Sequence, residues 1–270
     1  MKYLLFDIGA SRTRLAISED GVTLGEPVIF NTPQSFEEGI NAISEKAKQF
    51  GGGFGIAAGG IAGPINRDKT IINKAPNLPN WCDKPLKESL SEVLETEVYL
   101  ENDTALVGLG EAVAGAGKSN SVVAYVTVST GINGVKIVDN KIDKNYLGYE
   151  IGKQIIDFDE STIKGNWEDA ISGANLENKY SKNPDEIEDE EIWNEEVNLL
   201  SYGLYNVILF WSPEILILGG GLMKKIDTQK VEGKIKEIFT VFPVLPEIKK
   251  SELGDVGGLY GALHFVKSLQ

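Results

Sequence analysis

The order of the expected elements occurs twice along the 270-residue chain, and this repeat constrains the fold more than any other feature. Residues 2–30 have the composition of a strand meander, a helix with one apolar face follows at 35–50, and a short buried strand follows at 54–60. Strand pair, loop, helix and strand then occur again after residue 104. The repeat predicts an α/β protein made of two similar lobes rather than one continuous sheet.

The lobe boundaries follow from this order. We expect a first lobe at 1–104 and a second at 105–256, each near the usual domain size of about 100 to 150 residues. A last helix, at about 257–270, is expected to return to the first lobe. Within the second lobe, apolar periodicity predicts helices at 166–180 and 187–211.

Charge and hydropathy exclude two classes of partner. The 26 basic and 40 acidic residues give a formal charge of −14, which repels phosphate backbones and anionic membrane surfaces, so nucleic acid is not an expected partner. The longest apolar stretch, 204–222, is interrupted by Pro213 and Glu214, whereas a membrane span needs about 20 mostly apolar residues. No membrane anchor is expected.

Cysteine and histidine are scarce. Cys82 is the only cysteine, so no intrachain disulfide can form, which fits a reducing compartment and predicts a cytoplasmic protein. His264 is the only histidine, so any catalytic triad or histidine-rich metal site would depend on that one residue. Carboxylates are therefore the expected chemical groups.

Three glycine turns could approach phosphates. In FDIGASRTRLAI a strand ends at Asp7, a glycine permits a tight turn, and the Ser11 and Thr13 hydroxyls with nearby backbone N–H groups can face a phosphate or hydrated Mg²⁺. Taken alone, this segment could equally be an ordinary polar hairpin. Two more such turns, VTVSTGING and LILGGGLM, each follow a strand and favour a nucleotide site.

A further strand, in YLENDTALVGLGE, delivers Asn102 and Asp103 to the start of a helix. One interpretation is that Asp103 only caps the helix. A capping carboxylate that accepts backbone N–H bonds has a lowered pKa and is a poor base, so capping and base catalysis are competing roles.

The ordered set DIGASRTR, GIAAGGIAGPI, NKAPNLPNW, ENDTALVGLGE, STGING, YEIG and LILGGG resembles the ROK sugar kinases and the related bacterial glucokinases. The resemblance covers nearly the whole chain. It implies the α/β fold with two actin-like, ribonuclease H-like lobes and a cleft between them. It also implies a kinase that uses ATP and Mg²⁺ to phosphorylate a hydroxyl, chiefly the 6-hydroxyl, of glucose or a related hexose or N-acetylhexosamine.

The resemblance also assigns roles to individual residues. Asp103 would be the catalytic base, and Asp7 would hold Mg²⁺ through water. ATP would be bound by Asp7, Gly9, Ser11, Thr13, Thr130, Gly131, Gly219, Gly220 and Gly221. The sugar would be bound by Gly63, Asn77, Asn102, Asp103, Glu150, Lys153 and Glu168.

The chain departs from the family pattern at three places. Lys153 stands where the family has histidine, and an ammonium only donates hydrogen bonds, so either one sugar hydroxyl is bound differently or this loop is displaced. The segment STIKGNWEDAISG lacks the cysteines of the family's zinc motif, so no zinc site is expected. Asn133 replaces a common glycine, and asparagine tolerates left-handed backbone better than most residues.

Two alternatives remain beside the sugar kinase. One is a catalytically weak sugar-binding regulator on a kinase scaffold, which Lys153 favours. The other is another small-molecule kinase of the same superfamily, against which PNLPNW, END and WEDAISG argue. The sequence leaves the sugar and the oligomeric state open, with a homodimer as one expected assembly.

Overall fold

The computed structural model describes residues 1–157 and 164–269. The chain divides into two compact units, each considered below by itself: unit 1 comprises Met1–Gly115, Lys144–Gly148 and Leu253–Gln270, and unit 2 comprises Ala116–Asp143 and Tyr149–Glu252. Unit 1 therefore extends beyond the expected boundary at residue 104 and includes the next helix. That helix packs on the C-terminal helix, which belongs to the same unit.

Unit 1 contains a mixed five-stranded sheet with the order β3-β2-β1-β4-β5. Its strands are β1 (Tyr3–Ile8), β2 (Arg12–Ser18), β3 (Val28–Asn31), β4 (Ile56–Ile61) and β5 (Val98–Asn102). β1 pairs antiparallel with β2 and parallel with β4, which in turn pairs parallel with β5. The carboxyl ends of β1, β4 and β5 therefore meet at one edge of the sheet.

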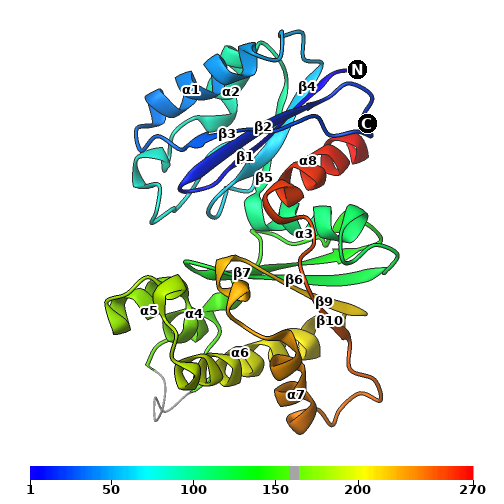
Figure 1. Cartoon of the computed structure of the whole chain (residues 1–270). Helices are drawn as coiled ribbons and strands as arrows, with labels where there is room; N and C mark the ends of the chain where they lie inside the picture. Colours follow the sequence, from blue (N-terminus) through cyan, green and yellow to red (C-terminus); the bar gives the residue numbers. More distant parts are fainter. Residues whose placement is uncertain (158–163, 270) are drawn as a thin grey trace. The chain divides into compact units, whose positions relative to one another are not determined.

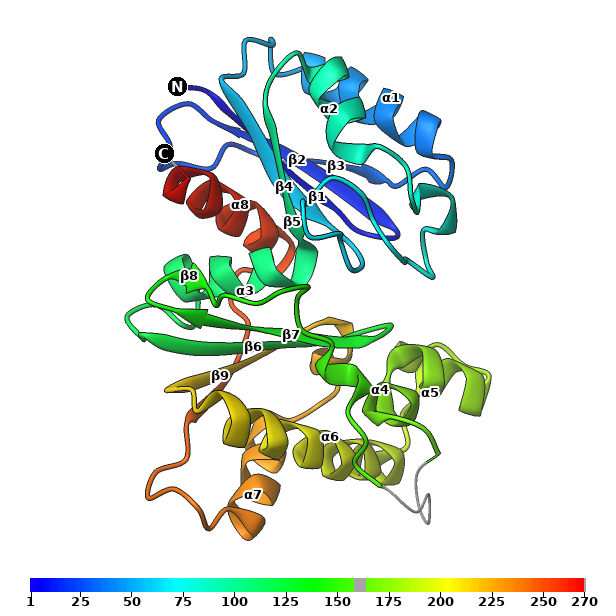
Figure 2. The ribbon, with the colours of Figure 1, turned by 180° about the vertical axis from the view of Figure 1, so that it is seen from behind.

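Helices cover both faces of this sheet (Figures 1 and 2). They are α1 (Phe36–Lys48), α2 (Leu86–Leu94), α3 (Asp103–Ala114) and α8 (Gly257–Ser268). Leu4, Phe6 and Ile8 of β1 join the apolar core with α1 and α2. Because side chains alternate along a strand, Asp7 points to the opposite face, where α8 packs against β1.

Unit 2 repeats the same sheet topology, with the order β10-β9-β6-β7-β8. Its strands are β6 (Val122–Val128), β7 (Ile132–Val138), β8 (Lys141–Ile142), β9 (Ile215–Gly219) and β10 (Glu247–Lys250). β6 pairs antiparallel with β7 and parallel with β9, as β1 does with β2 and β4. The two mixed sheets confirm the α/β class and the duplication that the repeated order of elements predicts.

The helices of unit 2 pack on one face of its sheet around a second apolar core. These helices are α4 (Trp167–Ile171), α5 (Gly173–Tyr180), α6 (Glu190–Trp211) and α7 (Thr228–Ile238). The short 3₁₀ turns of unit 2 are η2 (Ile151–Lys153), η3 (Pro184–Glu186) and η4 (Gly221–Lys224), and those of unit 1 are η1 (Pro79–Trp81) and η5 (Gly254–Val256). The helix expected at 166–180 is two helices, because Ser172 caps α5 and the Gly173 N–H donates to Ser129 O at 2.7 Å.

Two glycines let α3 and α8 approach each other closely. A Cβ at Gly261 would lie 1.8 Å from Leu106 O, and one at Gly110 would lie 2.1 Å from Gly257 O. Only a residue without a side chain fits at either position. Among the helices of residues 1–157 and 164–269, none is both long and apolar enough to cross a lipid bilayer.

Candidate functional site

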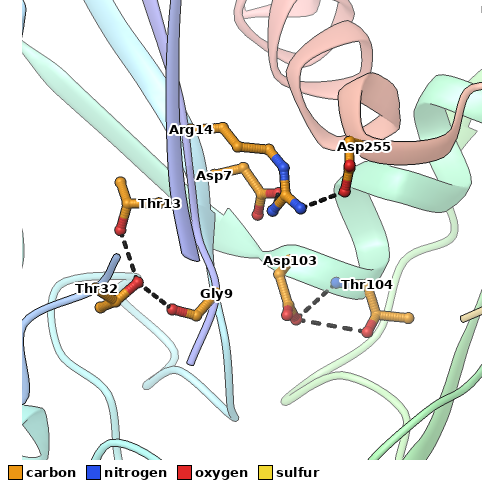
Figure 3. Close-up of polar contacts among 8 residues, drawn as sticks. All are labelled: Asp7, Gly9, Thr13, Arg14, Thr32, Asp103, Thr104 and Asp255. Carbon is orange, nitrogen blue, oxygen red and sulfur yellow. Dashed lines mark hydrogen bonds and ion pairs between the residues drawn. The ribbon is translucent and has the colours of Figure 1, made fainter. Parts of the chain in front are cut away.

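Asp7, near the end of β1, is held by an arginine from the neighbouring strand (Figure 3). Arg14 lies directly opposite Asp7 in the β1–β2 ladder and donates to Asp7 Oδ2 at 3.3 Å and also to Asp255 in η5. A Cβ at Gly258 would lie 3.2 Å from Asp7 Cγ, so the start of α8 adjoins the carboxyl. Burial raises the pKa of Asp7 to about 6, against the lowering effect of Arg14.

The turn after β1 is fixed by hydroxyl and backbone hydrogen bonds. The Gly9 N–H donates to Arg12 O at 3.0 Å, and the Thr32 hydroxyl donates to Gly9 O at 2.7 Å. Thr13 is buried, and its hydroxyl lies 2.9 Å from that of Thr32. In this arrangement Thr13 supports the turn from inside, whereas Ser11 is the exposed hydroxyl of the turn.

Asn102 rather than Asp103 caps α3. Asn102 Oδ1 accepts the Ala105 N–H at 3.1 Å, and Asp103 is the first residue of the helix. Asp103 Oδ1 accepts from the Thr104 N–H at 2.7 Å and from Asn102 Nδ2 at 3.2 Å. Despite these hydrogen bonds, burial and the charge of Asp7 raise the pKa of Asp103 to about 7.

This geometry removes the competition between capping and base catalysis. The capping role belongs to Asn102, and the pKa of Asp103 is raised rather than lowered. A carboxylate with a pKa near the operating pH is well suited to accept a proton from a hydroxyl. The arrangement at the end of β5 can therefore supply a general base.

The loop after β4 brings one further expected sugar residue beside Asn102. Asn102 Nδ2 donates to Gly63 O at 3.2 Å. Gly63 has a φ of +107°, and a Cβ there would lie 2.9 Å from Lys74 O, so this bend requires glycine. Asn77 is exposed in the loop before η1.

In unit 2 the turn between β6 and β7 is joined to Glu168 of α4. The Ile132 N–H donates to Glu168 Oε2 at 2.7 Å, and a Cβ at Gly131 would lie 2.6 Å from the same oxygen. Thr130 is exposed at the tip of the turn. Asn133, which replaces a common glycine, lies in β7 opposite Thr127 and is not among the described residues with a left-handed backbone, and its Oδ1 accepts the Gly134 N–H at 2.8 Å.

Lys153 forms an ion pair with Glu168. The hydrogen bond to Glu168 raises the pKa of Lys153, which stays an ammonium. Partial burial and the charge of Glu168 raise the pKa of Glu150, and Lys153 opposes that rise. Two carboxylates and one ammonium thus lie close together in unit 2, at the residues where the resemblance implies sugar binding.

The three glycines at the end of β9 and directly after it differ in their surroundings. A Cβ at Gly219 would lie 2.3 Å from the Tyr125 hydroxyl, and one at Gly220, whose φ is +93°, would lie 2.3 Å from Val128 O. A Cβ at Gly221 would meet no atom within 4 Å. Packing therefore requires the first two glycines, and Gly221 leaves open space beside the backbone.

The carboxylates of unit 1 fit a hydrated Mg²⁺ better than a fully protein-ligated ion. Within residues 1–157 and 164–269, no group of three or more histidine, cysteine or acidic side chains could enclose a metal. Mg²⁺ usually keeps several waters and is bound by one or two carboxylates together with substrate phosphates. Asp7 can provide one such carboxylate. Part of the segment expected to lack a zinc site, residues 161–163, lies outside the described residues.

Three supporting residues of the site have no role assigned from the sequence: Arg14, although it ends the motif DIGASRTR, Asp255 and Thr32. Arg14 contacts Asp7, Asp255 contacts Arg14, and Thr32 contacts Gly9. These contacts depend on strand register and on the return of the C-terminal helix. A charged residue at an inward position of β2 is the one signal that points to Arg14. Asp255 and Thr32 are separated from their partners by too much sequence for any local pattern to find them.

Comparisons with known proteins match the chain over nearly its whole length. The model of the ROK family matches residues 3–269. An N-acetyl-D-glucosamine kinase of Escherichia coli O127:H6 is 28% identical over 300 residues, which cover 96% of this chain and 97% of that protein.

Solved structures are similar in fold. The ROK hexokinase of Thermus thermophilus has a TM-score of 0.86 at 22% identity and covers 100% of this chain and 99% of its own. A ROK family glucokinase from Streptomyces griseus, in complex with glucose and AMPPNP, has a TM-score of 0.81 at 22% identity, over 99% of this chain and 100% of its own. These similarities confirm the actin-like fold.

Proposed function

This chain belongs to the ROK family, and from this premise we propose that it is an ATP-dependent sugar kinase. The enzyme transfers the γ-phosphoryl group of ATP to a hydroxyl, chiefly the 6-hydroxyl, of a hexose or N-acetylhexosamine. The observation that carries the proposal is Asp103: a carboxylate directly after β5, at the first position of α3, that does not serve as the N-cap and has its pKa raised to about 7. A base at this place suits the attack of a sugar hydroxyl on a phosphoryl group.

Asp103 accepts the proton of the attacking hydroxyl. Because phosphoryl transfer has a loose transition state, most of the acceleration comes from positioning and charge neutralisation, and the base contributes about 10²–10⁴-fold. Hydrogen bonds from Thr104 and Asn102 hold one oxygen of Asp103 and fix the orientation of the carboxylate. The second oxygen faces the substrate hydroxyl.

The family pattern assigns phosphate-binding residues to each of the two units. In unit 1, the turn from Gly9 to Ser11 binds phosphate oxygens, and Asp7 holds hydrated Mg²⁺, which neutralises phosphate charge when it is bound. In unit 2, Thr130 and Gly131 bind the phosphate chain, and Gly219, Gly220 and Gly221 lie near adenosine. This assignment rests on the family pattern and on the open backbone beside Gly221.

In unit 2, Glu150 and Glu168 accept hydrogen bonds from sugar hydroxyls, and in unit 1 the family pattern assigns sugar binding to Gly63, Asn77 and Asn102. Lys153, where the family has histidine, adds a donor that cannot accept. A substituent that only accepts, such as the carbonyl oxygen of an N-acetyl group, satisfies this ammonium. N-Acetylhexosamines are therefore the first sugars to test. The similarity to the N-acetyl-D-glucosamine kinase of Escherichia coli O127:H6 supports this choice.

The decisive experiment is coupled ADP release with Mg²⁺-ATP across hexoses and N-acetylhexosamines. Sugar-dependent turnover should fall at least about 100-fold in Asp103→Asn, and kcat/KM of the native enzyme should rise with pH up to about 7 as Asp103 loses its proton. Asp68→Asn, at an exposed aspartate of the same unit, is the matched control. No turnover with any sugar, together with a thermal shift on sugar binding, would leave a regulator and refute the kinase.

A further inference from the structure

Glu101, the residue before Asn102, is a buried carboxylate with two partners. It is 7% exposed in β5. Its Oε1 accepts the backbone N–H of Asn102 at 2.9 Å, and its Oε2 forms an ion pair with Lys69. A buried carboxylate needs such a cation, because an unpaired charge in a protein interior is strongly unfavourable.

Lys69 extends from a hydrogen-bonded turn. The turn lies in a hairpin closed by the Ile65–Ile72 bridge, and Lys69 itself has a left-handed φ of 53°. Asn66 holds the turn through Oδ1, which accepts the Thr70 N–H at 2.7 Å. The ammonium also lies 5.5 Å from the ring centroid of Phe265 in α8, so Lys69 links this hairpin, β5 and α8.

The contacts of Lys69 continue to the proposed base. Glu101 holds the backbone of Asn102, and the Asn102 side chain holds Gly63 O, the first turn of α3 and Asp103 Oδ1. Every group in this series is within hydrogen-bond distance of the next. Lys69 is thus linked to Asp103 through Glu101 and Asn102.

We propose that Lys69 is a positioning residue for phosphoryl transfer, acting through Glu101 and Asn102. This inference rests on the proposed function. Lys69 is not part of the motifs that carry the family resemblance. Its side chain is 44% exposed, so the ion pair would ordinarily contribute little, but here its partner is buried and holds the residue beside the base. Loss of the ammonium frees Glu101 to leave the Asn102 N–H.

The test compares Lys69→Met, which keeps the length of the side chain, with Lys69→Arg, which keeps the charge. Kinetics should show kcat about 10-fold or more lower in Lys69→Met, with the KM for ATP unchanged within about twofold, and recovery to within about threefold in Lys69→Arg. Lys84→Met is the matched control, because Lys84 pairs with Glu37 at 3.5 Å and both side chains are exposed.

A second measurement does not depend on turnover. Hydrogen exchange of a peptide spanning 98–106 should be faster in Lys69→Met than in the native protein, and unchanged in Lys84→Met. Glu101→Gln should also speed exchange of this peptide, and the variant that carries both substitutions should exchange little faster than either single variant. Unchanged exchange and unchanged kcat in Lys69→Met would overturn the inference. Absence of sugar-dependent turnover in the native protein would instead refute the proposed function, and the exchange measurement would still decide the role of Lys69.

Discussion

The carboxylate of Asp103 carries an energetic cost in the folded protein. Burial and the charge of Asp7 raise its pKa from 3.8 to about 7, so the folded state binds this proton more tightly than the unfolded state does. The free energy of unfolding therefore falls as pH rises from about 4 to about 7, and the full cost of ionising Asp103 in the folded protein is present above pH 7. Three pKa units correspond to at most about 4 kcal/mol.

Asp103→Asn should consequently be more stable than the native protein at pH 8, by about 1 to 3 kcal/mol, with a gap that shrinks toward zero at pH 4. Asparagine keeps the oxygen that accepts from Thr104 and Asn102 but not the charge. Urea unfolding at several pH values measures the gap, with Asp68→Asn as the control. An Asn variant that is less stable than the native protein at pH 8 would show that the ionised carboxylate stabilises the fold.

Lys153 is the second residue whose charge sets the behaviour of its neighbours. The ammonium pairs with Glu168 and lowers the pKa of Glu150, whereas burial and Glu168 raise it. Both carboxylates must be ionised to accept two sugar hydroxyls. Lys153→Met should raise the pKa of Glu150 further, because the opposing charge is lost, so that sugar binding weakens at a higher pH on the acid side.

Calorimetric titration of sugar between pH 5 and 8 tests this prediction. The acid-side midpoint should move to higher pH in Lys153→Met and stay in place in Lys153→Arg, which keeps the charge. A midpoint that does not move in Lys153→Met would mean that the ammonium has no effect on the ionisation of Glu150.

At the level of elements, the contact between α3 and α8 is the most sensitive feature of unit 1. A methyl group at Gly261 would lie 1.8 Å from Leu106 O, so Gly261→Ala must push the helices apart. We expect a loss of about 2 to 4 kcal/mol, as for other overpacked contacts. Gly233→Ala in α7 is the control, since its methyl group meets no atom within 4 Å and should be neutral or stabilising by up to about 1 kcal/mol. Thermal melting compares the two, and similar melting temperatures would refute the close approach of these helices.

The elements themselves were largely predictable, because apolar periodicity and turn residues are local. The strand ending near Asp7 and the helix capped by Ser35 are both present. The break at Ser172 was not predictable, because it depends on a hydrogen bond between Gly173 and Ser129, more than forty residues earlier. The cap of α3 is a similar case: two adjacent residues, Asn102 and Asp103, can both cap, and the surroundings decide between them.

The candidate site likewise has a part that the sequence predicts and a part that it does not. Motifs pointed to the glycine turns and to Asp103, because a phosphate or a sugar demands particular residue types at particular turns. The supporting residues came from partners distant in sequence, such as Lys69 with Glu101 and Arg14 with Asp255. No sequence pattern specifies such pairs, because a lysine or an arginine is common on any surface. Whole-chain packing determines which of them reaches the site.

At the scale of the whole molecule, the proposed sugar-binding residues are divided between the units: Asn102 and Asp103 belong to unit 1, and Glu150 and Glu168 belong to unit 2. A bound sugar should protect the segments that it contacts from local opening, since binding stabilises the protein by about 2.7 kcal/mol at 100 times its Kd. Hydrogen exchange with and without saturating sugar should therefore slow in peptides at 98–106 and at 164–172. In Glu168→Gln, measured at the same ratio of sugar concentration to Kd, exchange should still be slower in both peptides, because a lower affinity does not by itself remove the contact of the sugar with either peptide. Protection confined to one peptide in the native protein would mean that one unit alone holds the sugar, and the assignment of the other unit's residues would then be wrong.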